Sequence, residues 1–479
     1  MAKTLTLISL LLNIIATFAQ DLYPYGDEFP LGLYSLHNEL DSANLYGWNN
    51  GHRYAYQVND ITYPATPIPD SYFEDCRQNK LYSFARLSCI DSLGIKWKNP
   101  ISRTIKEIKQ QQEHSNISWW DMPEELRYWK KSEYDIVKEY SQLVEEYDHK
   151  RRPVYMYIPG HYSEEAIRRY VPFLDILPAS CYTNYQTLPH IYVRWSIERT
   201  QEAIRYNNKL GKDYLNKEKT VIAILELFEQ NNPLTREGTW HDFWLALACD
   251  VKGIQIFSHF YRKSSLTIES SWNTLNAAVQ LFKKWGIDKV LLLGDDIDLK
   301  NEVLEGKELA PTLNIQGKTY SLPSLKVLAK QYRDTIYVIS VNSSNQEIVY
   351  KLENIPPLII ESKNLLSEKI YEVNNQLLID TLKSLGVSIL KFYSDKSEIE
   401  STIFPSPTKN IFTVKITNSK ITFNRIIIFN LKGETIYTQD YEYSKEQTVS
   451  LKNIEQGMYI IQLIRNNEPI ARKKFLISY

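Results

Sequence analysis

Short apolar runs, separated by longer amphipathic segments, dominate the first 285 residues of the chain. The runs at 153–158, 174–182 and 220–228 are almost continuously apolar, as expected for strands that are buried on both faces. A helix beginning at Ser132 repeats its apolar positions at i, i+3, i+4 and i+7, which predicts one face packed on a sheet. This alternation of strand and helix indicates a parallel sheet covered by helices.

Eight such units fit within about 260 residues, which is the usual size of a (β/α)8 TIM barrel. We therefore predict an α/β chain whose barrel occupies residues 25–285. The second and third units carry the weakest signal, because 61–69 is rich in proline and has little helical pattern. The expected strands are 29–36, 53–58, 81–87, 117–126, 153–158, 174–182, 220–228 and 253–260.

After residue 290 the pattern changes to short strands in which apolar and polar positions alternate. The segments 335–342, 347–352 and 370–373 show this period of two, which predicts an antiparallel β-sandwich domain at 290–398. The acidic triplet around Asp295 is interpreted as a solvated loop rather than a calcium site.

A third unit is expected at 402–479, again as a β-sandwich. It opens with Phe404-Pro-Ser-Pro407, has a hairpin at Leu431-Lys-Gly-Glu434 and continues with Ile454-Glu-Gln-Gly-Met-Tyr459. These motifs, in this order, resemble the C-terminal sorting domain of the type IX secretion system of certain Gram-negative bacteria. Two positions depart from that family, Ser406 where asparagine is usual and Ile454 where leucine is usual. The resemblance implies delivery by the type IX secretion machinery; a plain β-sandwich module is the alternative.

Residues 1–19 have the pattern of a secretory signal peptide. Lys3 precedes the apolar segment 5–15, and small residues before Ala19 place cleavage after that residue. No later apolar run reaches the roughly 20 residues that a transmembrane helix needs. We expect a protein that is exported through the inner membrane and then secreted or attached to the cell surface. Outside the cytoplasm, Cys76 and Cys89 could form a disulfide or remain buried thiols.

Composition narrows the partner class. Aromatic residues make up 13% of the chain, with 34 Tyr and 10 Trp, and such rings either cover the apolar faces of sugars or fill β-rich cores. A net charge of −1 gives no excess of basic residues of the kind that binds nucleic acid. The chain has neither closely spaced histidine pairs nor a Gly-x-Ser-x-Gly motif. We predict no metal ion, no cofactor and a monomer.

Carboxylates stand where a barrel places its active site, after the C-terminal ends of its strands. Asp121 ends the apolar run of the fourth strand, and Glu124 follows it closely. Glu226 shares its side of the seventh strand with Ile222 and Ile224, and strands four and seven face each other across a barrel. Two acids there can act as proton donor and nucleophile or base on a glycosidic bond.

Other interpretations of these acids stay open. Glu124 could merely stabilise the N-terminus of a helix. Glu226 could be a hydrogen-bonded structural acid, in which case Glu229 or Asp121 would take its place in catalysis.

The barrel also resembles secreted glycoside-hydrolase-like barrels over roughly residues 110–262. The segments 225–228, 233–238 and 243–254 are similar to their seventh and eighth units, and Asp121-Met-Pro-Glu124 is similar to their acidic motif after strand four. Met122 replaces an acid of that motif, and Glu226 stands where some of these families have glutamine. The resemblance implies cleavage of a glycosidic bond. By analogy with the families that have glutamine at this position, Glu226 would instead be a residue that contacts the sugar.

We therefore expect a glycoside hydrolase acting on a poly- or oligosaccharide, with Glu124 as proton donor and Glu226 or Asp121 as nucleophile or base. The alternatives are a catalytically inactive carbohydrate-binding barrel and a purely structural surface protein. Sugar rings are expected to stack on Trp48, Trp120 and Trp240, with hydroxyl contacts from His52, His161, Tyr182 and His259.

Overall fold

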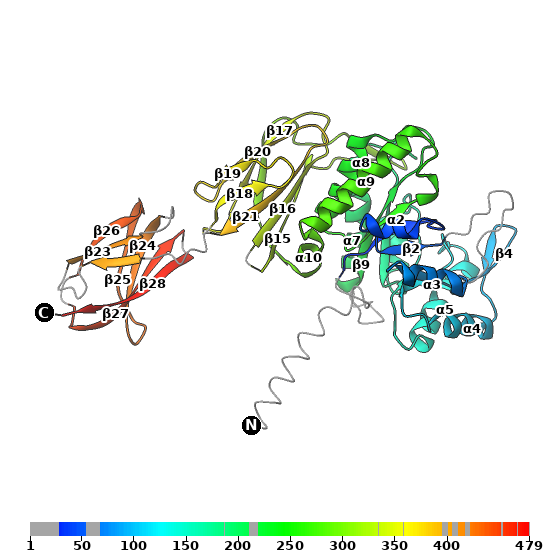
Figure 1. Cartoon of the computed structure of the whole chain (residues 1–479), viewed down its shortest axis with the longest axis horizontal. Coiled ribbons are helices and arrows are strands. Elements are labelled where there is room, and N and C mark those ends of the chain that lie inside the picture. Colours follow the sequence, from blue (N-terminus) through cyan, green and yellow to red (C-terminus); the bar gives the residue numbers. More distant parts are fainter. Residues whose placement is uncertain are drawn as a thin grey trace, which may run out of the picture.

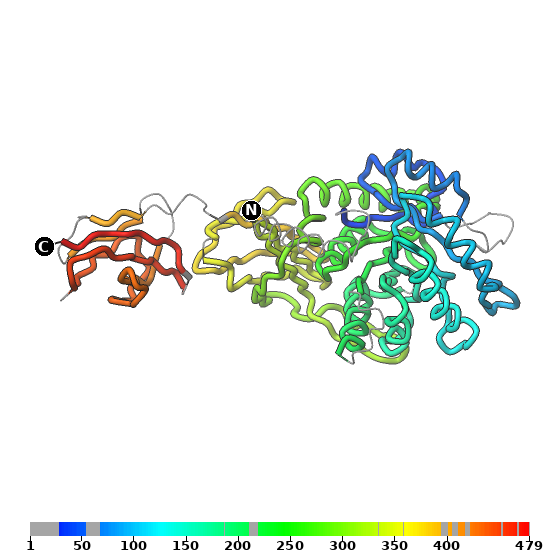
Figure 2. Tube along the Cα trace, turned by 90° about the horizontal axis from the view of Figure 1, so that it is seen from below, coloured from blue at the N-terminus to red at the C-terminus, as the bar shows by residue number. Residues whose placement is uncertain are grey.

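The computed structural model describes residues 28–53, 68–185, 187–209, 219–333, 335–357, 359–394, 401–404, 411–416, 422–451, 454–466 and 468–478. Three parts follow one another along its long axis, and the C-terminal part lies at the opposite end from the barrel (Figures 1 and 2). The expected signal peptide at 1–19 lies outside the described residues. In the described part of the chain, no helix is long and apolar enough to cross a membrane.

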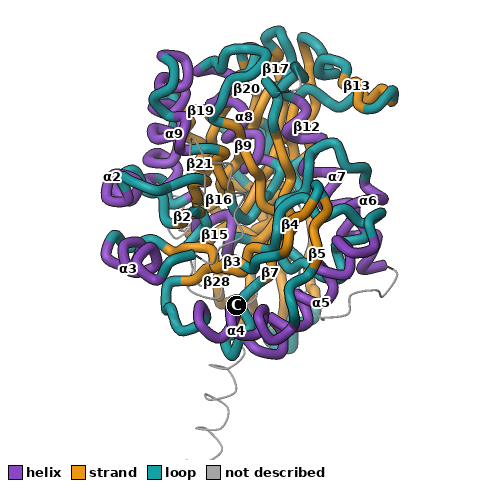
Figure 3. Tube along the Cα trace, turned by 90° about the vertical axis from the view of Figure 1, so that its right-hand side faces the viewer, coloured by secondary structure: helices purple, strands orange, loops and turns teal. Residues whose placement is uncertain are grey.

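The first part is a closed barrel of eight parallel strands, as the alternation of strand and helix predicts. The strands close in the order β1-β10-β9-β8-β7-β6-β3-β2, and Figure 3 shows helices placed around them. The barrel strands are β1 (Leu31–Tyr34), β2 (Asn50–His52), β3 (Tyr82–Arg86), β6 (Ile117–Asp121), β7 (Val154–Tyr155), β8 (Ile176–Cys181), β9 (Thr220–Glu226) and β10 (Ile254–Phe257).

Amphipathic helices cover the barrel, and several begin at a side chain that caps their first turn. Ser163, Thr235 and Ser265 each accept a hydrogen bond from a backbone N–H three residues on, which satisfies a donor that the helix cannot. The helices are α2 (Leu40–Leu45), α3 (Asp70–Gln78), α4 (Ile101–Gln111), α5 (Lys131–Tyr147), α6 (Glu164–Arg168), α7 (Ile191–Lys209), α8 (Arg236–Ala248), α9 (Leu266–Lys284) and α10 (Ile287–Leu293), with the 3-10 helix η1 (His259–Tyr261).

One strand differs from its expected position. The second strand was expected at 53–58 but lies at Asn50–His52, and residues 54–58 are outside the described part. The side chains of Asn50 and His52 are polar yet fully buried. Hydrogen bonds satisfy them there, from Asn50 to Ser118 and between His52 and Asp121. Hydrophobic patterning therefore could not locate it. The hairpin of β4 (Ile90–Ser92) and β5 (Ile95–Trp97) was not expected from the sequence either.

The second part consists of antiparallel sheets. A six-stranded sheet has the order β11-β15-β16-β21-β18-β19, and a three-stranded sheet has the order β12-β17-β20. A separate hairpin, β13-β14, reaches back along the barrel, where its residue Gln316 donates a hydrogen bond to the carbonyl oxygen of His161. The strands are β11 (Asp295–Asp296), β12 (Lys300–Glu305), β13 (Leu313–Ile315), β14 (Lys318–Tyr320), β15 (Leu325–Tyr332), β16 (Thr335–Asn342), β17 (Ile348–Glu353), β18 (Ile359–Asn364), β19 (Ile370–Glu372), β20 (Leu378–Leu382) and β21 (Val387–Ser394).

The third part has two antiparallel sheets around its own apolar core. Gly433 adopts a positive φ of 85° in the turn between β24 and β25, as the predicted hairpin requires. The strands are β22 (Ser401–Phe404), β23 (Ile411–Ile416), β24 (Phe423–Asn430), β25 (Thr435–Ser444), β26 (Glu446–Ser450), β27 (Gly457–Arg465) and β28 (Glu468–Ile477). The predicted fold class, a barrel followed by antiparallel sheets and a C-terminal unit, is confirmed.

Candidate functional site at the barrel mouth

Aromatic side chains fill the barrel interior. One buried cluster draws its members from strands alone, including Tyr34, Phe84, Trp119 and Tyr155, so it lies inside the barrel rather than beneath the helices. The hydroxyl groups of Tyr34 and Tyr155 are hydrogen-bonded to each other. At the strand ends, Tyr182 continues this lining.

Beside these rings lies a buried ionic network made by the last residues of β2, β3 and β6. The Asp121 carboxylate accepts hydrogen bonds from Arg86 Nε and Nη2 at 3.2 and 3.1 Å, and its Oδ2 lies 2.9 Å from His52 Nε2. All three side chains are at most 4% exposed. Burial lowers the pKa of His52 to about 4, so this ring is neutral at pH 7. Asp121 therefore forms an internal ion pair with Arg86.

Glu124 lies in the turn that follows β6 and is half-buried. Burial is the main cause that raises the pKa values of Tyr34, Tyr155 and Tyr182 well above 10, and the negative charge of Glu124 adds to the shift at each. The Glu124 carboxylate thus lies close enough to act electrostatically on three tyrosines of the barrel mouth. The carbonyl oxygen of Glu124 accepts a hydrogen bond from Lys96 of β5, which fixes the turn.

Glu226, the last residue of β9, is 7% exposed and is held by the loop that follows β8. Its carboxylate accepts hydrogen bonds from the backbone N–H groups of Asn184 and Tyr185 at 2.6 and 3.2 Å, and from Thr183 Oγ1 at 2.8 Å. The Asn184 side chain adds a fourth at 3.0 Å. Burial outweighs these bonds and, together with the nearby charge of Asp242, raises the pKa of Glu226 to about 7.

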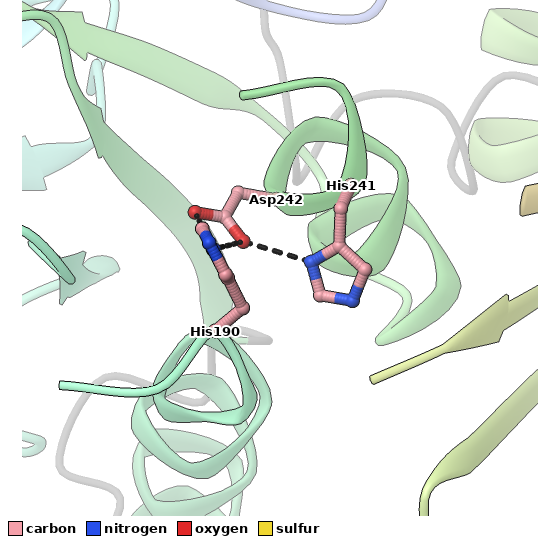
Figure 4. A group of neighbouring side chains, drawn as sticks. All are labelled: His190, His241 and Asp242. Carbon is pink, nitrogen blue, oxygen red and sulfur yellow. Dashed lines mark hydrogen bonds and ion pairs between the residues drawn. The ribbon is translucent and has the colours of Figure 1, made fainter. Parts of the chain in front are cut away.

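Asp242 of α8 lies between two imidazole rings (Figure 4). His190 Nδ1 lies 2.8 Å from Asp242 Oδ1, and His241 Nδ1 lies 2.9 Å from the same oxygen. A narrow cavity of about 10 Å³, the room that one water molecule needs, adjoins Glu226, His190 and Asp242. Burial lowers the pKa of His190, but the charges of Asp242 and Glu226 and its bond to Asp242 outweigh this and raise it overall.

The ligand atoms of His190, His241 and Asp242 lie within 4.8 Å of one another, so these residues could hold a metal ion. Both ring nitrogen atoms of His241 are already hydrogen-bonded, however, because Nε2 lies 3.0 Å from Ser343 Oγ. We interpret the group as a hydrogen-bond network that joins the rim of the barrel to the following sheets.

Two of the three tryptophans expected to stack on sugars, Trp48 and Trp120, are not available to a ligand. Trp48 and Trp120 are both fully buried in the core between strands and helices, where their Nε1 atoms donate to Asn276 and Asp148. Trp240 on α8 is half-buried against that core. Trp48 and Trp120 have no ring face exposed to a ligand in this structure. The neighbour Trp119, whose side chain points inward, takes the place in the barrel that had been assigned to Trp120.

The four hydroxyl-binding candidates are also dispersed. Tyr182 lies at the mouth, within range of the Glu124 charge, and His52 belongs to the buried network of Asp121. His259 is 3% exposed and packs its ring against Trp272, and burial lowers its pKa to about 3. His161 is exposed on the loop after β7.

Several residues of the mouth escaped the sequence analysis. Tyr34, Tyr155 and Arg86 each end a barrel strand, and a polar or amphipathic residue at the end of an apolar run was the available signal. Asp242 lies inside a helix and gives no such signal. Cys76 and Cys89 are free thiols here, and burial raises the pKa of Cys76 to about 12.

The chain is similar to known proteins in part of its sequence and in its fold. Over 123 residues the chain is 27% identical to the ulvan lyase NLR42 of Nonlabens ulvanivorans, a match that covers 25% of this chain and 23% of that protein. The chain thus spans about a quarter of the length of the curated relative that it matches.

Solved structures with a similar arrangement include the α-amylase of Geobacillus thermoleovorans, at 10% identity and a TM-score of 0.49, covering 78% of this chain and 99% of that one. The α-galactosidase I of Mortierella vinacea has 12% identity and a TM-score of 0.45, covering 77% and 97%. Similarity at this level carries no information about the substrate.

The C-terminal unit gives a firmer result. Residues 402–478 match the model of the secretion system C-terminal sorting domain. This match covers the segment in which the Leu431-Lys-Gly-Glu434 hairpin and the final strand suggested that family. Residues 402–478 are therefore a secretion system C-terminal sorting domain, as the resemblance to the type IX family predicted, and they follow the parallel barrel and the antiparallel sheets.

Proposed function

We propose that the barrel mouth binds a saccharide and hydrolyses a glycosidic bond, with Glu124 as the proton donor. The observation that carries this proposal is the position of Glu124, half-buried at the C-terminal end of the barrel and within electrostatic range of Tyr34, Tyr155 and Tyr182. Active sites of such barrels lie at this end. Tyr34 and Tyr155 are fully buried beneath it, whereas the half-buried Tyr182 can offer a ring and a hydroxyl group to a sugar.

In this proposal Glu226 is the second carboxylate, acting as nucleophile or base. It ends β9, which lies three strands from β6 around the barrel. Its pKa of about 7 lies close to neutral pH, where acid–base catalysts are most effective. To attack a sugar, Glu226 would have to exchange some hydrogen bonds to Thr183, Asn184 and Tyr185 for contact with substrate.

A second candidate function is saccharide binding without hydrolysis. Two observations favour it. Asp121 is paired with Arg86, and Glu226 is hydrogen-bonded to the loop after β8, so both carboxylates already have partners within the protein. In that case Asp121 and Glu226 would maintain the structure of the mouth, and Glu124 and Tyr182 would contact hydroxyl groups of the saccharide. The relative named an ulvan lyase is a further reason to consider a saccharide ligand.

We also propose that the sorting domain directs the protein to the type IX machinery after a signal peptide has taken it across the inner membrane. The C-terminal match supports this route. Deleting residues 402–478 should leave the protein in the periplasm. Normal delivery of the truncated protein to the surface or medium would contradict this route, and a point variant in the barrel serves as the control for folding.

The function is tested by screening the full-length mature protein against soluble polysaccharides, including ulvan, for retention and for product release. Hydrolysis adds one water to the products for each bond cleaved, whereas elimination adds none, so product masses separate the two reactions. Binding with hydrolysis supports the first candidate, and binding without products supports the second. If the protein neither binds any polysaccharide of the panel nor releases products from one, both candidate functions are contradicted.

A further inference from the structure

The loop between β6 and α5 is anchored along its length. Met122 N–H donates to the carbonyl oxygen of Tyr155 at 2.9 Å, and Tyr128 N–H donates to the hydroxyl group of Tyr170 at 2.9 Å. Arg127 Nε donates at 2.8 Å to Glu133, whose side chain is fully buried. Residues 122–130 therefore present their outward side chains in one fixed arrangement.

This anchored loop exposes one large ring, that of Trp129, which is 55% exposed. The ring lies 5.1 Å from that of Tyr128 and 5.6 Å from that of Tyr162, measured between centroids. Tyr162 is itself buried and stacks on Tyr170. A tryptophan whose ring is already contacted by two other rings loses little conformational entropy when a ligand covers its exposed part.

Polar groups from two other segments lie around Tyr162, the residue that supports Trp129. The exposed imidazole of His161 packs edge-on against the Tyr162 ring at 5.1 Å. The exposed Gln316, from the tip of the β13-β14 hairpin, donates to the His161 carbonyl oxygen at 2.9 Å. We call Trp129, His161, Tyr162 and Gln316 the rim platform.

The rim platform adjoins the barrel mouth. Glu125, the neighbour of Glu124, donates its N–H to the carbonyl oxygen of Tyr157 at 3.2 Å. After burial, the Glu125 charge is the next cause that raises the pKa of Tyr162 to about 12, and it also adds to the raised pKa of Tyr157. Tyr157 in turn stacks on Tyr182 at 6.3 Å. Trp129 is thus linked to the tyrosines around Glu124 through the ring of Tyr162, the charge and backbone of Glu125, and the ring of Tyr157.

We infer that the rim platform is a second saccharide subsite, which holds a sugar ring of the same chain that occupies the barrel mouth. This inference rests on the proposed function. An exposed indole suits the apolar face of a sugar, and the exposed His161 and Gln316, which reach Trp129 only through Tyr162, could bind hydroxyl groups farther along the saccharide. A protein partner would need a contiguous apolar patch of several side chains, whereas Trp129 is followed directly by the exposed Lys130 and Lys131.

The subsite predicts that affinity depends on saccharide length. The probes are size-fractionated oligosaccharides prepared from the polysaccharide that the full-length protein retains. Wild-type affinity should rise once the oligosaccharide spans both the mouth and the platform. Trp129→Ala should remove that rise, with a loss of roughly tenfold or more for long oligosaccharides and none for the shortest that binds. Trp129→Phe should restore part of it.

Trp97 of β5 supplies the matched control, because it is also exposed, at 48%. Trp97→Ala should bind every oligosaccharide as the wild type does. Equal losses in the two variants, or unchanged length dependence in Trp129→Ala with an unchanged melting temperature, would overturn the subsite while leaving the proposed function in place. If the wild type retains no polysaccharide, the proposed function fails first and the subsite with it.

Discussion

Glu124, in the turn after β6, and Glu226, the last residue of β9, both lie at the C-terminal end of the barrel, yet their surroundings differ. Glu124 is half-buried in a turn and acts electrostatically on the tyrosines of the mouth. Glu226 is 7% exposed, and its oxygen atoms accept four hydrogen bonds from residues 183–185. Both acids lie at the C-terminal end of the barrel, and the neighbouring loop sets how tightly each carboxylate is held.

The largest effect is expected at Glu124. Glu124→Gln removes a proton donor without changing the size of the side chain, so turnover should fall roughly 10²- to 10⁴-fold while oligosaccharide affinity is kept. Initial rates and binding isotherms measure the two effects separately. Glu165→Gln, an exposed acid on α6, is the control and should retain full activity. Full activity in Glu124→Gln would remove Glu124 from this role.

Asp121 tests whether the buried network is structural. Asp121→Asn leaves the Arg86 cation buried without its counter-charge, which should cost about 3–5 kcal/mol in the free energy of unfolding of the barrel. Denaturant unfolding followed by tryptophan fluorescence measures this loss. Asp135→Asn breaks an exposed ion pair with Lys131 instead and should have little effect. Similar unfolding curves for the two variants would show that the network does not stabilise the barrel.

Glu226 gives a smaller effect that depends on pH. Burial, aided by Asp242, raises its pKa from 4.5 to about 7, so between these values the folded protein holds a proton that the unfolded chain releases. The stability contributed by this group is fully present below pH 4.5 and is lost as pH rises through 7, by up to about 3 kcal/mol.

Glu226→Gln does not titrate at this position, so the variant should gain stability relative to the wild type between pH 5 and 8. Thermal unfolding of both proteins across this pH range measures the difference in stability. Asp242 and His190 are the same in both proteins, so the comparison isolates residue 226. A difference that does not change with pH would contradict the raised pKa.

Much of the barrel could be predicted from the sequence, because its strands are buried on both faces and read as apolar runs. β8 and β9 lie within the expected segments 174–182 and 220–228. β2 could not be located, since its buried side chains are polar and are satisfied by partners far away in the chain, such as Ser118 and Asp121.

The site was harder to predict than the fold. Adjacent strand residues point to opposite faces, and the sequence gives no way to tell which of Trp119 and Trp120 faces inward. The structure places Trp119 with the rings inside the barrel and Trp120 in the core beneath the helices. The network around Asp242 depends on the approach of α8 to the loop after β8, a tertiary contact without a local signal.

The central claim, that a saccharide binds at the mouth beside Glu124, is tested most directly by a crystal structure of Glu124→Gln with a bound oligosaccharide. The account predicts a glycosidic oxygen within about 2.6–3.2 Å of the residue-124 side chain, with a sugar ring near Tyr182. A saccharide bound away from the mouth, or at the mouth but with residue 124 beyond hydrogen-bonding distance of any glycosidic oxygen, would contradict it.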